Sequence, residues 1–177
     1  MRKNPPNVAA SLRQRLLNLA HERQEEFQAV LTRYASERLL YRLSVSPHRE
    51  EFVLKGAMLF TLWGGETHRA TRDLDLLGRG EPSIERMEKV FRKICQTHSE
   101  DDGLVFDVTT LRGSRIREDA LYPAVRVEMV ARLGVARIHL QVDIGFGDAV
   151  PTRAEKVEFP TLLDLPAPKV RVYSRER

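Results

Sequence analysis

The sequence has 177 residues, of which 42% are apolar and 31% are charged, and its formal net charge is +4. This balance is ordinary for a soluble globular protein with one sizeable core. No apolar run approaches the roughly 18 residues that a membrane helix needs, and the N-terminus lacks the apolar segment of a secretory signal. The mild positive charge permits a nucleic-acid partner without requiring one.

The single cysteine, Cys95, cannot form an internal disulfide, which fits a cytoplasmic protein. It lies in an amphipathic helical pattern, so we expect it to pack in the core rather than to act as a nucleophile.

The N-terminal quarter of the chain is predicted to be helical. Apolar residues recur at helical spacing from Ser11, a candidate N-cap, to about Arg42, and either two helices or one bent helix fits the pattern. Ser46-Pro47-His48 breaks it. We therefore divide the chain into an N-terminal helical segment, 1–48, and a catalytic core, 49–177. The helical segment is interpreted as a cap on that core or as a docking surface.

Short strands and helices alternate in the next part of the chain. The pattern predicts a strand at 52–54, a short apolar helix at 57–63, a strand at 73–77 and a helix that begins after Ser83. Glycines follow or close three of these elements, which favours tight turns between them.

The remainder is predicted to be mostly β. Strands are expected at 105–110, 122–131 and 136–144, with a hairpin turn at 133–135. The last of these strands places Asp143 near its end, on the face opposite the core. Arg126 and Glu128 share a face of the strand before it, which favours a cross-strand ion pair for Glu128. The tail from Pro160 contains three prolines and then a basic stretch.

Two acids, Asp73 and Asp75, lie one residue apart in an apolar strand pattern. Residues i and i+2 of a strand share a face, so the two carboxylates project together. Carboxylates this close repel each other unless a proton or a cation lies between them. Their oxygens suit Mg²⁺, which usually also takes phosphate oxygens as ligands. The pair therefore indicates a metal site that handles phosphate.

Two further elements can complete such a site. Lys55-Gly56 lies at a strand-to-helix junction, where the glycine lets a phosphate approach the backbone. Asp143 can add a third carboxylate. Nucleotidyl transfer needs these parts, because a metal neutralises the triphosphate and aligns the attacking hydroxyl, while a third acid shares a second metal or acts as general base.

The ordered set of motifs resembles the AbiEii/AbiGii-type nucleotidyltransferases, the toxin components of type IV toxin–antitoxin and abortive-infection systems. The resemblance rests on FVLKGA at 52–57, RATRDLDL at 69–76 and LQVDIGFGD at 140–148, and it runs from about Phe52 to Arg177. It implies an α+β fold of the DNA polymerase β-like nucleotidyltransferase type, a mixed sheet flanked by helices. It also implies a Mg²⁺-dependent enzyme that transfers a nucleotide from a nucleoside triphosphate to an RNA acceptor such as tRNA.

The resemblance also implies the roles of individual residues. The catalytic and metal-binding residues are Asp73, Asp75 and Asp143. The nucleotide-binding residues are Lys55, Gly56, Ala57, Arg69, Thr71 and Arg72. A cognate antitoxin is the implied protein partner, with no membrane partner.

The chain departs from the family pattern in two places. Ala57 stands where the family often has a second glycine or a serine, and it cannot donate a side-chain hydrogen bond. Family members usually continue beyond a segment like 170–176 into helices that help to bind the nucleotide, so we expect a C-terminally truncated core. A truncated gene, a fragment, and a protein completed by a separate chain all fit this pattern. Apolar surface left uncovered by the missing helices would favour a homo-oligomer.

Other functions use the same residues. A catalytically impaired homologue would serve as a nucleotide-, RNA- or protein-binding module. A phosphodiesterase or nuclease is less well supported, because histidines at metal-ligand spacing are missing.

Overall fold

The computed structural model describes residues 7–62, 73–116, 122–147 and 154–172. The helices span Val8–Arg23 (α1), Phe27–Val45 (α2), Met58–Leu62 (α3) and Ile84–Cys95 (α4), and a short 3-10 helix spans Arg49–Glu51. The strands span Phe52–Lys55 (β1), Asp73–Gly78 (β2), Leu104–Arg115 (β3), Ala124–Leu133 (β4), Ala136–Gly145 (β5), Glu155–Glu158 (β6) and Lys169–Val172 (β7).

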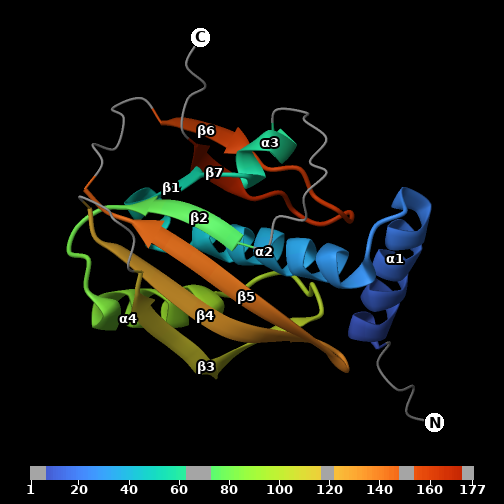
Figure 1. The fold of residues 1–177 in the computed structure, drawn as a ribbon. Coiled ribbons are helices and arrows are strands. Elements are labelled where there is room, and N and C mark those ends of the chain that lie inside the picture. The colour runs from blue at the N-terminus through green and yellow to red at the C-terminus, as the bar shows by residue number, and fades with distance from the viewer. Residues whose placement is uncertain (1–6, 63–72, 117–121, 148–153, 173–177) are drawn as a thin grey trace.

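The strands form one mixed sheet of seven strands in the order β3-β4-β5-β2-β1-β7-β6 (Figure 1). Neighbours that follow one another in the chain pair antiparallel, whereas β2 pairs parallel with β5 and β1 pairs parallel with β7. Parallel pairs need long crossover connections, so they join segments that are distant in sequence. The predicted α+β class with a mixed sheet and flanking helices is confirmed.

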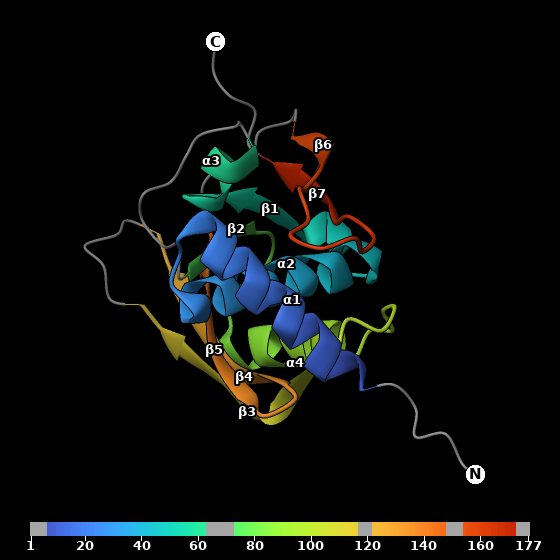
Figure 2. The same cartoon turned by 90° about the vertical axis from the view of Figure 1, so that its right-hand side faces the viewer.

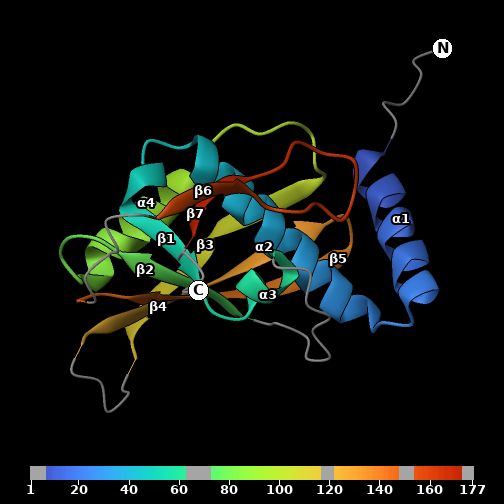
Figure 3. The ribbon, with the colours of Figure 1, turned by 90° about the horizontal axis from the view of Figure 1, so that it is seen from above.

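Helices α1, α2 and α4 lie together on one side of strands β3 to β5 (Figure 2), and the view from above shows the same layers (Figure 3). Along β4 and β5 every second side chain is buried beneath them, as the period of a strand requires. The other side of these strands, the polar face, carries Arg126, Glu128, Arg137, His139, Gln141 and Asp143.

The two N-terminal helices begin and end at different residues from those predicted. Asn7, not Ser11, caps α1, and its side-chain oxygen accepts a hydrogen bond from the Ala10 N–H at 3.1 Å. Gln24 takes a left-handed conformation, with φ of 54°, and this turn separates α1 from α2. Of the two alternatives from the sequence, two helices are therefore observed.

Most residues of α2 between Val30 and Leu43 are buried, because the helix lies between the sheet and other segments of the chain. The apolar core is continuous from α1 and α2 through the sheet to α4. Cys95 is part of this core, as predicted, and burial raises the pKa of its thiol to about 12. The division of the chain at residue 48 stays a prediction.

Four strands differ from the sequence prediction by two residues or more. β4 spans Ala124–Leu133, two residues later at each end than the predicted 122–131. β3 continues to Arg115, five residues past the predicted end at Thr110, with a register shift between Asp107 and Arg112. β6 and β7 were not predicted at all. Such short edge strands carry little pattern of their own, and the three prolines nearby favour irregular structure.

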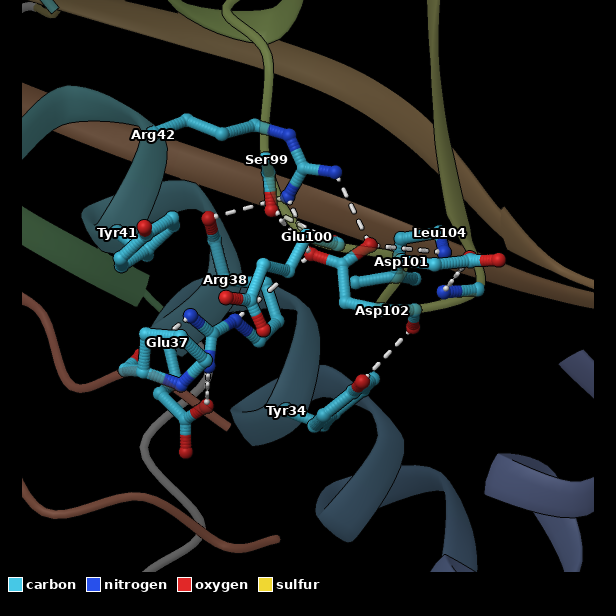
Figure 4. A network of polar contacts seen from close by, with 12 residues as sticks. Tyr34, Glu37, Arg38, Tyr41, Arg42, Ser99, Glu100, Asp101, Asp102 and Leu104 are labelled. Atoms are coloured by element: carbon cyan, nitrogen blue, oxygen red, sulfur yellow. Dashed lines mark hydrogen bonds and ion pairs between the residues drawn. The ribbon is translucent and has the colours of Figure 1, made fainter. Parts of the chain in front are cut away.

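A network of buried ionic groups joins α2 to the loop that precedes β3 (Figure 4). The Arg42 guanidinium donates two hydrogen bonds to the Asp102 carboxylate, at 2.7 and 3.0 Å. Arg38 approaches the same carboxylate at 3.7 Å, and the Tyr34 hydroxyl donates to the Asp102 carbonyl at 2.8 Å. Since Arg38 and Asp102 are 1% and 2% exposed, each charge depends on the others for compensation.

The same network holds the segment that leads into β7. The Arg38 guanidinium donates to the Pro166 carbonyl at 2.7 Å, and the Glu37 carboxylate accepts a hydrogen bond from the Leu162 N–H at 2.6 Å. Glu37 also pairs with Arg38 at 3.2 Å. Two adjacent residues of α2 therefore fix the path of a segment more than a hundred residues later in the chain.

Glu37 is expected to make stability depend on pH. Burial raises the pKa of its carboxyl from 4.5 to about 7, against the opposing effects of the Leu162 N–H and Arg38. The folded state then binds the proton more tightly than the unfolded state, so the contribution of Glu37 is fully present below about pH 4.5 and declines as pH rises through 7.

The measurement is the free energy of unfolding in urea between pH 4.5 and 8, for the wild-type chain and for Glu37→Gln. The stability of the wild type relative to the variant should fall across this window and then level off. A constant difference would contradict the prediction.

Few large apolar side chains are exposed in the part of the chain that the structure describes. They are Val45, Val105, Tyr122 and Val135, and they belong to different segments. Single exposed apolar residues are common on soluble proteins. A homo-oligomer stays a prediction.

Candidate active site

Four charged side chains form a row across the polar face, one from each of four adjacent strands. Lys55 of β1 stands opposite Asp75 of β2, which is level with Asp143 of β5. Asp143 in turn stands opposite Arg126 of β4. Residues in register project to the same face of a sheet, so these side chains are neighbours. The two carboxylates therefore lie between two cations.

The alternation of β2 places its acids on this face. Leu74 and Leu76 are each 1% exposed and pack in the core, whereas Asp73 and Asp75 on the other face are half-buried. Asp73 is level with Gln141, which lies two residues before Asp143 on β5 and on the same face. The structure thus brings the three predicted aspartates to one region of one face, through a parallel pairing that the sequence does not reveal.

Gly56 is required by the close approach of Asp75. Its φ is +79°, which favours glycine, and a Cβ atom at this position would overlap the Asp75 carboxylate. The turn after β1 therefore lies directly against Asp75. Ala57, at the start of the following turn, is exposed.

Lys55 extends across β2 toward Gly145 at the end of β5. A Cβ built on Gly145 would come within 3.1 Å of the Lys55 Nζ atom, so the ammonium group lies over the end of β5. Gly145 leaves room for it there. Lys55 is half-buried, and it places a positive charge on the face that carries Asp75 and Asp143.

Arg126 closes the other end of the row. Its Nε and Nη2 atoms donate to Asp143 Oδ1 and Oδ2 at 2.9 and 3.3 Å. This hydrogen-bonded pair, together with the charges of Asp143 and Asp73, raises the pKa of Arg126 against the opposing effect of burial. The ion pair expected for Glu128 is not observed among the described residues, because the partner of Arg126 lies on β5 instead.

The donor chemistry of the three aspartates fits a hard divalent cation, because carboxylate oxygens are the ligands that Mg²⁺ prefers. In the described part of the chain, no group of three or more His, Cys, Asp or Glu side chains is gathered closely enough to hold a metal ion. Both oxygens of Asp143 are engaged by Arg126. The three carboxylates share one face of the sheet.

Some predicted residues cannot be placed. Arg69, Thr71 and Arg72 lie outside the described residues. Two other residues were not predicted to belong to the site: Arg126, which binds Asp143, and Gly145, which lies under Lys55. Two features of the sequence could have indicated these residues. Gly145 directly follows Ile144 at the end of a predicted strand, and Arg126 lies on the polar side of its strand.

The sheet order brings paired acids beside a glycine turn, an arrangement that suits nucleotidyl transfer. The chain matches the family described as the nucleotidyl transferase AbiEii toxin of type IV toxin–antitoxin systems over residues 38–177. It therefore belongs to this family. No curated protein sequence matches the chain.

Two solved structures from Helicobacter pylori resemble the fold. One is described as a candidate nucleotidyltransferase, with a TM-score of 0.50, 16% identity, and coverage of 84% of this chain and 55% of that one. The other is the protein JHP933, with a TM-score of 0.50, 17% identity, and coverage of 84% and 53%. The chain thus spans about half the length of each of these structures. At this identity the likeness supports the fold, which is of the predicted nucleotidyltransferase type.

No helix in the described ranges combines the length and the apolar character needed to cross a membrane.

Substituting Gly56 with alanine is expected to displace Asp75 and reduce activity strongly. Gly134 offers a matched control, since its φ is +59° but a Cβ there meets only Ala9, at an ordinary 3.7 Å. Both variants should lose about 1–3 kcal/mol of stability through backbone strain. Only Gly56→Ala should also lose nucleotide transfer, measured with labelled triphosphate. Equal transfer rates for the two variants would contradict this role of Gly56.

Proposed function

We propose that this chain carries the catalytic core of a Mg²⁺-dependent nucleotidyltransferase, which transfers a nucleotide from a nucleoside triphosphate to an RNA acceptor such as tRNA. We further propose that it acts in the cytoplasm and that a cognate antitoxin controls it. The family match supports nucleotidyl transfer and an antitoxin partner.

The observation that carries the proposal is the register of β1, β2 and β5. It sets Asp75 beside Asp143, and it sets Asp75 against the Lys55-Gly56 turn. Acids from two strands and a glycine turn from a third have no structural need to meet on an otherwise polar face. Their meeting matches the needs of phosphoryl chemistry, in which charge must be neutralised and the reacting groups aligned.

Each residue then has a defined role. Asp73 and Asp75 would hold the Mg²⁺ ion, with Asp143 either sharing a second ion or acting as general base. When bound, the metal supplies electrostatic stabilisation of the charge on the phosphates. Lys55 provides a positive charge beside them, and Gly56 leaves the backbone accessible to a phosphate oxygen.

A binding module without turnover is the second candidate. The observation that favours it is the bidentate contact of Arg126 with Asp143, which engages both oxygens of one proposed ligand. Such a protein would still present Lys55 and the glycine turn to a nucleotide.

The two candidates are separated by incubating the purified chain with each of the four labelled nucleoside triphosphates and total tRNA, with Mg²⁺ or with EDTA. We expect Mg²⁺-dependent label on the RNA with at least one of them. Nucleotide or RNA binding without label in any reaction would contradict the enzyme and support the binding module.

A further inference from the structure

The contact between Arg126 and Asp143 is built into the sheet. Arg126 stands opposite Asp143 in the antiparallel β4–β5 ladder, and the two side chains are 36% and 21% exposed. The guanidinium meets the carboxylate with two hydrogen bonds, the geometry that arginine adopts with planar anions. Because both residues belong to long paired strands, the contact does not depend on a loop.

We propose that Arg126 acts as an internal counter-cation, which holds Asp143 until a divalent cation displaces the guanidinium from the carboxylate. The inference rests on the proposed function, because it assumes that Asp143 is a metal ligand.

Two observations support this role. First, Asp143 lies level with Asp75, and adjacent carboxylates need a cation between or beside them. Second, the guanidinium is hydrogen-bonded to both Asp143 oxygens. A metal ion that coordinates one of these oxygens must therefore break at least one of the hydrogen bonds.

Arginine suits this role better than lysine. Its charge persists at all physiological pH values, so a change in pH does not release Asp143. Its planar fork also fixes the orientation of the carboxylate. Asp143 is thereby kept in one conformation. Only a cation that binds the carboxylate more strongly than Arg126 does can displace the guanidinium.

The test measures Mn²⁺ binding to the full chain, from the electron paramagnetic resonance signal of the free ion at about 0.15 M salt, where distant charges are largely screened. Arg126→Met should bind Mn²⁺ about three- to tenfold more tightly than the wild type, the range expected for loss of a partly exposed charged pair. Arg126→Lys, which keeps the charge but not the fork, should fall between the two.

Arg132→Met is the matched control. Arg132 lies on the same strand and the same face, pairs with Asp107 at 3.2 Å, and its loss changes the net charge equally. It is six residues from Arg126, roughly 20 Å along the strand. Its Mn²⁺ affinity should equal that of the wild type. Asp143→Asn combined with Arg126→Met should remove the gain.

A second measurement does not depend on the affinity. Without metal, Arg126→Met leaves the carboxylates less compensated and should melt at a lower temperature than the wild type. Saturating Mn²⁺ should raise its melting temperature more than that of the wild type. If Arg126→Met fails to fold, Arg126→Gln, which retains polar contacts, replaces it in both measurements.

The outcomes separate this inference from the proposed function. Mn²⁺ binding by the wild type with unchanged or weaker binding by Arg126→Met overturns the role of Arg126 alone. Absence of Mn²⁺ binding by the wild type and by every variant overturns the metal site, and the inference with it.

Discussion

Replacing Asp75 with asparagine is expected to abolish nucleotide transfer while the chain still folds. Asp75 lies inside the row of charged side chains, with Lys55 opposite it on one side and Asp143 level with it on the other. Asparagine keeps its shape but removes the charge that would bind the metal. Because metal stabilisation of the transition state is worth several kcal/mol, the rate should fall roughly a thousandfold or more.

The measurement is the initial rate of label transfer to tRNA, with circular dichroism to confirm the fold. Asp107→Asn is the control, since Asp107 is another aspartate of the same sheet, paired with Arg132 rather than placed in the row. It should leave the rate unchanged. Transfer by Asp75→Asn at the wild-type rate would refute the proposed site.

Replacing Asp102 with asparagine is expected to destabilise the fold severely. The Asp102 carboxylate is the shared partner of Arg42 at 2.7 Å and Arg38 at 3.7 Å, all three side chains being buried. Without its charge, the Arg42 guanidinium loses its ion-pair partner inside the protein, and Arg38 retains only Glu37. Breaking a buried ion pair in this way costs about 3–5 kcal/mol, which corresponds to a fall in Tm of roughly 10 °C.

Arg92→Met provides the comparison. Arg92 pairs with Glu88 at 3.3 Å on the exposed side of α4, with 44% of its side chain accessible. Such a surface pair is worth less than about 1 kcal/mol. Urea unfolding of both variants should therefore show a large loss for one and almost none for the other. Similar losses would mean that the buried network contributes no more than a surface pair.

Local patterns predicted the elements that build the site. The alternation in β2 and β5 and the glycine after Lys55 were sufficient to place Asp73, Asp75 and Asp143 on strand faces, because period and turn chemistry are properties of short segments. The same reasoning did not predict β6 and β7. Val170 and Val172 do alternate with charged residues, but a four-residue edge strand among prolines is a weak signal.

Which strands lie side by side could not be read from the sequence. The parallel pairing of β2 with β5 joins residues far apart in the chain, and it alone makes Asp75 a neighbour of Asp143. The partner of Arg126 depends on the same sheet order. Because Arg126 and Glu128 share a face of one strand, the sequence favoured an ion pair for Glu128. The acid that Arg126 binds is instead Asp143 of the neighbouring strand β5.

The direction of β7 has a practical consequence for anyone who labels or fuses this protein. β7 runs parallel to β1, with Val172 level with Leu54, so it delivers the chain to the sheet edge where Lys55 and Gly56 lie. α1 begins at the other end of β5, where Ala9 lies beside Gly134 of the β4–β5 hairpin. A fluorophore or affinity tag ahead of α1 is thus remote from the aspartates, whereas β7 ends on the side of the sheet where Lys55 and Gly56 lie.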